Sequence, residues 1–274
     1  MADAGGRNLR LRIYSASVLA PLAVAAVLAG DPAFPAAVAG FAALLALEWD
    51  RICRRTGDVG SGAGGVLAAG VALVVLVAWS QGPMAALVAC LAVTVAMLVV
   101  ARVDGQDVVV WRALGTFYIG LPAVAIIALR GVADGGAETT LWLFGTVWAT
   151  DIGGYAVGRV VGGPRLAPAI SPGKTWSGAL GGLGLAVAVG AGLAAVLGSH
   201  GGPAVMVASL LVGLAAEAGD LLESAIKRRF GVKDSGDAIP GHGGLFDRLD
   251  SLLVAAPTVW VAVLLTGESP LAWR

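Results

Sequence analysis

Long apolar runs recur along almost the whole chain, and they restrict its fold more than any other feature. An α-helix of about 20 mainly apolar residues crosses the ~30 Å hydrocarbon core of a bilayer. Nine runs approach or reach that length, at residues 13–29, 33–49, 63–80, 83–101, 112–129, 140–158, 177–198, 203–223 and 251–267. The sequence therefore predicts an all-α fold, a polytopic integral membrane helical bundle with about nine transmembrane helices.

Composition supports the same class of protein. Hydrophobic residues make up 58% of the chain and charged residues 13%, whereas soluble domains carry about 25% charged residues. Cys53 and Cys90 are the only cysteines, too few for a disulfide framework. The basic N-terminus followed by an apolar run is similar to a signal peptide, but because further apolar runs follow, we expect the first run to be retained as a span.

The placement of Lys and Arg predicts the orientation. If the N-terminus is cytoplasmic, sixteen of the 18 Lys and Arg residues fall on the cytoplasmic side, and Arg130 and Arg274 fall outside. Such a bias is typical of membrane proteins, whose cytoplasmic loops are rich in Lys and Arg. We expect an N-terminal transmembrane region over residues 1–140, with about five spans. A C-terminal catalytic region over 141–274, with about four spans and cytoplasmic motif loops, would follow.

Acidic residues lie at the predicted cytoplasmic ends of three spans. Asp151 ends the sixth span, Glu217, Asp220 and Glu223 end the eighth, and Asp247 and Asp250 open the ninth. Charges at bilayer depth are costly, so they usually have a partner or a function. Mg²⁺ binds one or two carboxylates together with water and substrate phosphates. The acids therefore favour a divalent cation site; the alternative is a structural ion network with Lys227, Arg228 and Arg248.

Two polar segments next to these acids are suited to phosphate binding. Residues 240–244 (PGHGG) and 171–175 (SPGKT) combine helix-breaking residues with exposed amides, hydroxyls or Lys near a helix start. The segment 171–175 is not a P-loop, because Pro168 stands where the first Gly of that motif would fall. His242 alone is more often a hydrogen-bonding loop residue than a catalyst. Acids, bases and bent backbone at a membrane surface together suggest phosphoryl or nucleotidyl transfer to a lipid headgroup.

The same residues resemble the signature of phosphatidate cytidylyltransferases. The match runs through Ser224-x-x-Lys227-Arg228, Lys233-Asp234 and Pro240-x-His242-Gly243-Gly244-x-x-Asp247-Arg248-x-Asp250. Upstream, Asp151-x-x-x-Tyr155-x-x-Gly158-Arg159, residues 166–176 and Gly219-Asp220 also resemble the family. The resemblance covers about residues 145–255. One departure is Ser177, where the family usually has Glu, and Glu217 or water is a candidate to replace that side chain.

The resemblance implies transfer of CMP from CTP to phosphatidate, with Mg²⁺ as cofactor. It implies metal ligands among Asp220, Asp247, Asp250 and Asp151, and catalytic roles for Lys227, Arg228, Asp247 and Asp220. It implies substrate binding by Ser171, Lys174, Thr175, Ser224, His242, Gly243, Gly244 and Arg248. Trp176 is expected to be an interfacial anchor. The expected location is the bacterial plasma membrane, with the active site on the cytoplasmic side.

Several alternatives stay open from the sequence. A CTP-dependent kinase of polyprenol or phytol type would use the same nucleotide, but it would release CDP instead of pyrophosphate. A transporter is a further alternative, although transporters place polar residues at mid-depth in matched halves, and here those residues gather in one half. Whether a second cation binds and whether the chain forms a homodimer also stay open. We expect the bilayer, CTP and phosphatidate as partners, and no nucleic acid.

Overall fold

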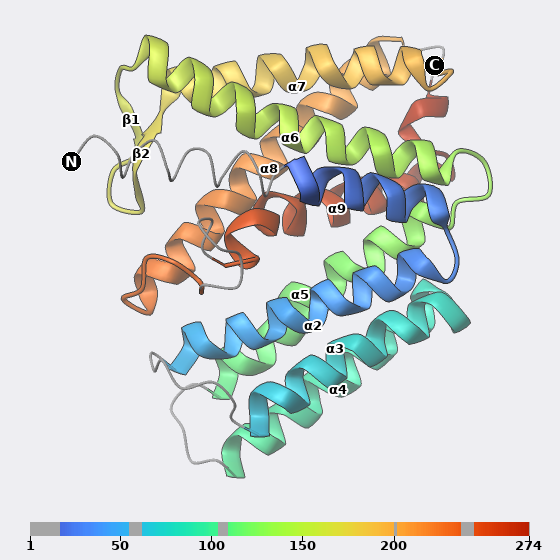
Figure 1. Ribbon diagram of the computed structural model, residues 1–274, viewed down its shortest axis with the longest axis vertical. Coiled ribbons are helices and arrows are strands. Elements are labelled where there is room, and N and C mark those ends of the chain that lie inside the picture. Colours follow the sequence, from blue (N-terminus) through green and yellow to red (C-terminus); the bar gives the residue numbers. More distant parts are fainter. Residues whose placement is uncertain (1–16, 55–61, 104–108, 200–201, 237–243, 274) are drawn as a thin grey trace. The chain divides into compact units, whose positions relative to one another are not determined.

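The structure is a computed structural model that describes residues 17–54, 62–103, 109–199, 202–236 and 244–273. The chain forms two compact units, each made of two stretches of sequence (Figure 1). Unit 1 contains Met1–Val124 and Phe230–Leu249, and unit 2 contains Ala125–Arg229 and Asp250–Arg274. The predicted division of the chain at residue 140 stays a prediction, because these units are defined by packing and not by catalytic role.

The predicted all-α membrane class is confirmed. Among the described residues, seven helices are long and apolar enough to cross a membrane: α2 (Ala33–Arg54), α3 (Gly62–Gln81), α4 (Pro83–Val103), α5 (Val109–Arg130), α7 (Trp176–Val196), α8 (Pro203–Arg229) and α9 (Phe246–Thr266). The chain is an integral membrane protein. Two other predicted spans also form helices. Ser17–Ala29 is a shorter apolar helix, and α6 (Gly136–Val161) is long but interrupted by Thr, Gly and Asp151.

A buried polar group joins α2 to α5 within unit 1. Asp50 on α2 is 2% exposed and pairs with two guanidinium groups. Its Oδ1 lies 2.8 Å from Nε of Arg112, and its Oδ2 lies 2.9 Å from a terminal nitrogen of Arg54. The neighbouring Trp49 donates its indole N–H to the carbonyl of Trp111 at 2.8 Å. A buried carboxylate is tolerated only when charges and hydrogen bonds compensate its lost hydration, so these contacts fix the packing of α2 against α5.

Glycines allow α6 and α7 to pack almost backbone to backbone in unit 2, where the two helices lie side by side (Figure 1). A Cβ atom at Gly153 would stand 2.8 Å from the carbonyl oxygen of Gly181, and one at Gly178 would stand 2.8 Å from that of Gly154. Small residues permit such close approach between membrane helices. The polar end of α6 is thereby held against the start of α7.

An antiparallel pair of short strands connects α6 to α7. β1 (Arg165–Ala167) pairs with β2 (Ser171–Thr175), with Arg165 opposite Thr175 and Ala167 opposite Ser171. The sequence predicts only a bent loop here, since strands of three and five residues carry too little pattern to recognise. A 3-10 turn, η1 (Pro270–Ala272), follows α9 near the C-terminus.

Candidate active site

Three carboxylates meet at one end of unit 2. Asp220 and Glu223 on α8 and Asp250 on α9 each offer an oxygen, and these oxygens lie within 4.8 Å of one another. Glu223 is 1% exposed, and the other two are partly exposed. Asp220 and Asp250 are two of the four predicted metal ligands. Glu223 is absent from that prediction, although its position three residues after Asp220 on a helix was a signal for it.

Gly219 explains why the two helices that carry these acids approach so closely. A Cβ atom at this position would stand 2.5 Å from the carbonyl oxygen of Asp250 and 3.1 Å from Cα of Ser251. Only hydrogen fits there, so α8 and α9 cross in direct contact beside Asp220. Gly219 therefore allows the close contact between α8 and α9, and Asp220 next to it provides a carboxylate of the cluster.

A fourth carboxylate adjoins the cluster from α6. Ser251, which is 2% exposed, donates its hydroxyl to Oδ1 of Asp151 at 3.2 Å. The backbone N–H of Ser251 donates to Oδ1 of Asp250 at 2.7 Å. One serine thus contacts both carboxylates, which places Asp151 beside the acidic cluster.

Two lysines contact the acidic cluster. Nζ of Lys174, on β2, lies 2.8 Å from Oδ2 of Asp220, and Nζ of Lys227, one turn after Glu223 on α8, lies 2.7 Å from Oε1 of Glu223. Arg228 instead donates Nε–H to the carbonyl of Ile170 at 3.3 Å, which joins α8 to the strand connection. Cations and carboxylates therefore alternate at this end of unit 2, as both the metal-site and the ion-network interpretations require.

Thr175 and Ser177 cap the start of α7. The Thr175 hydroxyl accepts the N–H of Gly178 at 3.1 Å and lies 3.0 Å from the Ser177 hydroxyl. Ser177 also donates to the carbonyl of Gly162, just beyond α6. The residue that stands in place of the usual Glu thus joins the end of α6 to the start of α7. Of the other residues predicted for substrate binding in unit 2, Ser171 lies at the start of β2 and Ser224 lies on α8.

Asp247 lies in unit 1, at the start of α9, and its carboxylate accepts hydrogen bonds from Ser235 and Gly244. Oδ2 accepts the Ser235 N–H at 3.1 Å, the Ser235 hydroxyl at 2.9 Å and the Gly244 N–H at 3.1 Å. Arg248 follows on α9 with an exposed side chain. His242 and Gly243, also predicted for substrate binding, lie outside the described residues. Whether Asp247 ligates metal stays a prediction.

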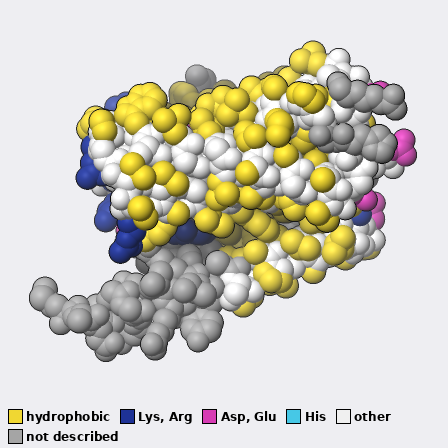
Figure 2. All heavy atoms as spheres, turned by 90° about the horizontal axis from the view of Figure 1, so that it is seen from above, with side chains coloured by type: hydrophobic (Ala, Val, Ile, Leu, Met, Phe, Trp, Pro, Cys, Tyr) yellow, Lys and Arg dark blue, Asp and Glu magenta, His cyan; other side chains and the backbone are white. Residues whose placement is uncertain are grey.

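On the face shown in Figure 2, charged side chains gather at two opposite edges. The described cations of unit 2 other than Arg130 lie where α6 and α8 end and α7 begins: Arg159, Arg165, Lys174, Lys227, Arg228 and Arg229. Figure 2 shows Lys and Arg at the left edge, Asp and Glu at the right edge, and hydrophobic side chains between them. An apolar band between two charged ends suits a membrane-spanning unit.

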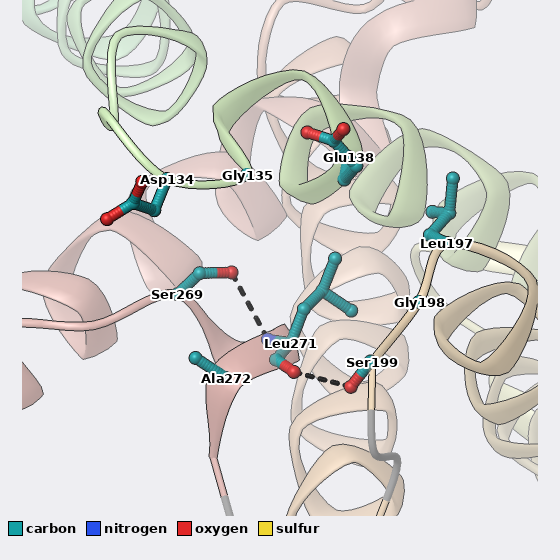
Figure 3. Close-up of a pocket in the computed structure, with 9 residues that line it drawn as sticks. All are labelled: Asp134, Gly135, Glu138, Leu197, Gly198, Ser199, Ser269, Leu271 and Ala272. Atoms are coloured by element: carbon teal, nitrogen blue, oxygen red, sulfur yellow. Dashed lines mark hydrogen bonds between the residues drawn. The ribbon is translucent and has the colours of Figure 1, made fainter.

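A pocket of about 400 Å³ lies at the opposite end of unit 2 (Figure 3). Asp134, just before α6, and Glu138, in the first turn of α6, line it together with Ser199 and Ser269. Figure 3 shows the Ser199 hydroxyl bonded to the carbonyl of Leu271, and the Ser269 hydroxyl accepting the Leu271 N–H at 3.2 Å. Glu138 precedes Asp151 by thirteen residues on α6, roughly 20 Å of helix, so this pocket is separate from the acidic cluster.

The chain belongs to the Cytidylyltransferase family, whose sequence model it matches over residues 10–266. Among curated relatives, the phosphatidate cytidylyltransferase of Brucella suis biovar 1 (strain 1330) is 48% identical over 151 residues, which cover 55% of this chain and 56% of the relative.

Two further relatives carry the same name. The phosphatidate cytidylyltransferase of Helicobacter pylori (strain ATCC 700392 / 26695) is 43% identical over 49% of this chain and 51% of its own. The phosphatidate cytidylyltransferase of Bacillus subtilis (strain 168) is 35% identical over 58% of this chain and 60% of its own length. The chain spans a little over half the length of the curated relatives it matches.

Proposed function

We propose that this protein transfers CMP from CTP to phosphatidate, giving CDP-diacylglycerol and pyrophosphate. The observation that carries the proposal is the acidic cluster of Asp220, Glu223 and Asp250, with Lys174 and Lys227 paired to two of its members. The names of the relatives support the same reaction and the same substrates. The location that we propose is the bacterial plasma membrane, with the N-terminus and the acidic cluster on the cytoplasmic side.

The donor set fits Mg²⁺. Within the part of the chain that the structure describes, the cluster offers carboxylate oxygens, the hard ligands that Mg²⁺ prefers, and neither Cys nor His. Asp220, Glu223 and Asp250 would hold the ion, with Asp151 next to them. When bound, Mg²⁺ would supply positive charge for the phosphates of CTP. Asp247 is retained as a candidate ligand on the strength of the signature.

The reaction needs charge neutralisation more than a base. The phosphate monoester of phosphatidate has a second pKa near ~6, by analogy with phosphoserine, so it is mostly ionised at neutral pH. Its oxygen forms a bond to the α-phosphorus of CTP, the bond from that phosphorus to the bridging oxygen breaks, and pyrophosphate leaves with the electron pair. Positioning and charge stabilisation supply the catalysis in such a displacement.

The lysines would change partners during binding. Lys174 and Lys227 neutralise Asp220 and Glu223 without substrate, at 2.8 and 2.7 Å. With those carboxylates holding a cation, both ammonium groups would be available for phosphate oxygens, and Arg228 on the same helix end would add a third positive charge. In this proposal the lysines bind phosphate oxygens when substrate is present, and the two ion pairs are the arrangement without substrate.

The test is release of pyrophosphate by the purified protein in detergent micelles that contain phosphatidate, CTP and Mg²⁺. We expect release that depends on the lipid and is lost in Asp220→Asn. A Glu138→Gln variant, altered in the pocket at the other end of unit 2, is the matched control and should keep wild-type turnover. Formation of CDP without pyrophosphate would instead identify a CTP-dependent lipid kinase and refute the proposal.

A further inference from the structure

Glu48 is a buried carboxylate to which neither the signature nor the acidic cluster gives a role. It lies on α2 in unit 1 and is 2% exposed. Its hydrogen bonds reach almost two hundred residues along the sequence, to the start of α9. Its Oε1 accepts the N–H of Leu245 at 2.9 Å, and its Oε2 accepts the N–H of Phe246 at 2.7 Å.

These two contacts cap a helix from outside its own sequence. The first N–H groups of an α-helix have no partner within the helix, and a carboxylate there also interacts favourably with the helix dipole. α9 begins at Phe246, so Glu48 satisfies the N–H groups that open this helix. The position of α2 therefore determines where α9 starts.

Glu48 and Asp247 share a partner. The Ser235 hydroxyl lies 3.3 Å from Oε2 of Glu48 and 2.9 Å from Oδ2 of Asp247. Gly244 completes the arrangement: a Cβ atom on it would stand 1.8 Å from the Ser235 hydroxyl and 2.7 Å from Oε2 of Glu48. This network fixes the Asp247 carboxylate on one side and the first turn of α9 on the other.

Aromatic packing holds the same helix start. The rings of Trp49 and Phe246 have centroids 5.8 Å apart, and Tyr118 on α5 lies 5.3 Å from Trp49 and 5.8 Å from Phe246. Trp49 follows Glu48 directly, so two consecutive residues of α2 contact Phe246. Glu48 accepts the backbone N–H of Phe246, and Trp49 packs against its ring.

We propose that Glu48 is a positioning residue for Asp247, the candidate metal ligand at the start of α9. It holds the start of the helix on which Asp247 is the second residue. The inference rests on the proposed function for the metal role of this acid. Residues that orient metal ligands without touching the metal typically change metal affinity by about 10- to 100-fold when they are replaced.

The test compares Glu48→Gln with wild type in two measurements. Hydrogen exchange followed by mass spectrometry should show faster exchange of the Leu245 and Phe246 amides in the variant, since the Gln side chain has one acceptor in place of two. Titration with Mg²⁺ in the pyrophosphate assay should show a half-saturating concentration about tenfold higher, with the KM for CTP at saturating Mg²⁺ within about twofold.

Asp50→Asn is the matched control, because Asp50 is on the same helix, is equally buried and pairs with Arg54 and Arg112. It should lower thermal stability but leave the Mg²⁺ half-saturation within about twofold of wild type. If Glu48→Gln does not fold, Ser235→Ala serves, since it removes the shared hydroxyl and leaves both amide contacts of Glu48. It should raise the half-saturation about threefold, as expected for one hydrogen bond.

The outcomes separate the two proposals. Unchanged exchange at Leu245 and Phe246 in Glu48→Gln, or an unchanged Mg²⁺ requirement in an active enzyme, would overturn the positioning role. An equal shift in Asp50→Asn would also overturn it, because general destabilisation would then explain the result. A wild-type protein that releases no pyrophosphate would refute the proposed function, whereas the exchange measurement would still decide whether Glu48 holds the start of α9.

Discussion

Nζ of Lys174 lies 2.8 Å from Oδ2 of Asp220, which joins the strand before α7 to the acidic cluster on α8. Forty-six positions separate the two residues in sequence, and they lie on β2 and on α8. The ion pair therefore brings the candidate phosphate-binding segment SPGKT to the candidate metal site. The Lys174 ammonium and the Asp220 carboxylate are therefore already adjacent before substrate binds.

Lys174→Met should lower cytidylyl transfer by at least about 100-fold, the scale expected when a charge-stabilising group at a reacting phosphate is lost. Met keeps the length of the side chain but removes its charge. The measurement is kcat/KM for CTP in phosphatidate micelles. Arg130→Gln, a cation at the other end of unit 2, is the control and should stay within about twofold. Near-wild-type turnover of Lys174→Met would exclude a phosphate-binding role.

Glu223→Gln should raise the Mg²⁺ concentration needed for half-maximal activity, by about tenfold or more. The substitution preserves shape but removes one of the three carboxylate charges within 4.8 Å of one another. It also releases Lys227 from its ion pair. Titration with Mg²⁺ at fixed CTP measures the effect, and an unchanged titration curve would show that Glu223 serves only the ion pair with Lys227.

Gly219→Ala should destabilise the protein by about 1–3 kcal/mol, the usual cost of adding a methyl group to a tightly packed contact. The new Cβ would stand 2.5 Å from the Asp250 carbonyl oxygen, so α8 and α9 must separate at the acidic cluster, and activity should fall with stability. Gly184→Ala on α7 is the control. Its Cβ would meet nothing within 4 Å, and it should be neutral or stabilising. Thermal unfolding in detergent compares the two, and equal midpoints would contradict the packing argument.

Thr175→Ala should cost about 1 kcal/mol of stability, because it removes the side chain that caps α7. Thr175→Ser keeps the hydroxyl and should restore both stability and activity. Thermal midpoints and pyrophosphate release are measured on both variants. If Thr175→Ala loses activity at temperatures where it remains fully folded, the hydroxyl also contacts substrate, as the resemblance implies. If stability does not change, the capping interpretation is wrong.

Local sequence predicted the helices well, and it predicted part of the candidate site. Apolar length identified even α2, whose apolar run is bounded by Asp31-Pro32 and Glu48. Their place at the predicted ends of two spans drew attention to Asp220 and Asp250, which the structure brings together with Glu223. The strand pair at residues 165–175 escaped prediction because such short strands depend on pairing with each other and not on a pattern of their own.

The sequence by itself determined that this is an all-α membrane protein whose polar chemistry lies in a few segments, because hydrophobic length and charge placement are properties of the chain alone. Only the tertiary structure decided which of those charges meet. Gly219 shows the reason: its importance comes from the Asp250 carbonyl of another helix, which no local pattern reveals. The contacts of Glu48 with Leu245 and Phe246 follow the same principle, since buried carboxylates take their partners from whatever chain folding brings within hydrogen-bonding distance.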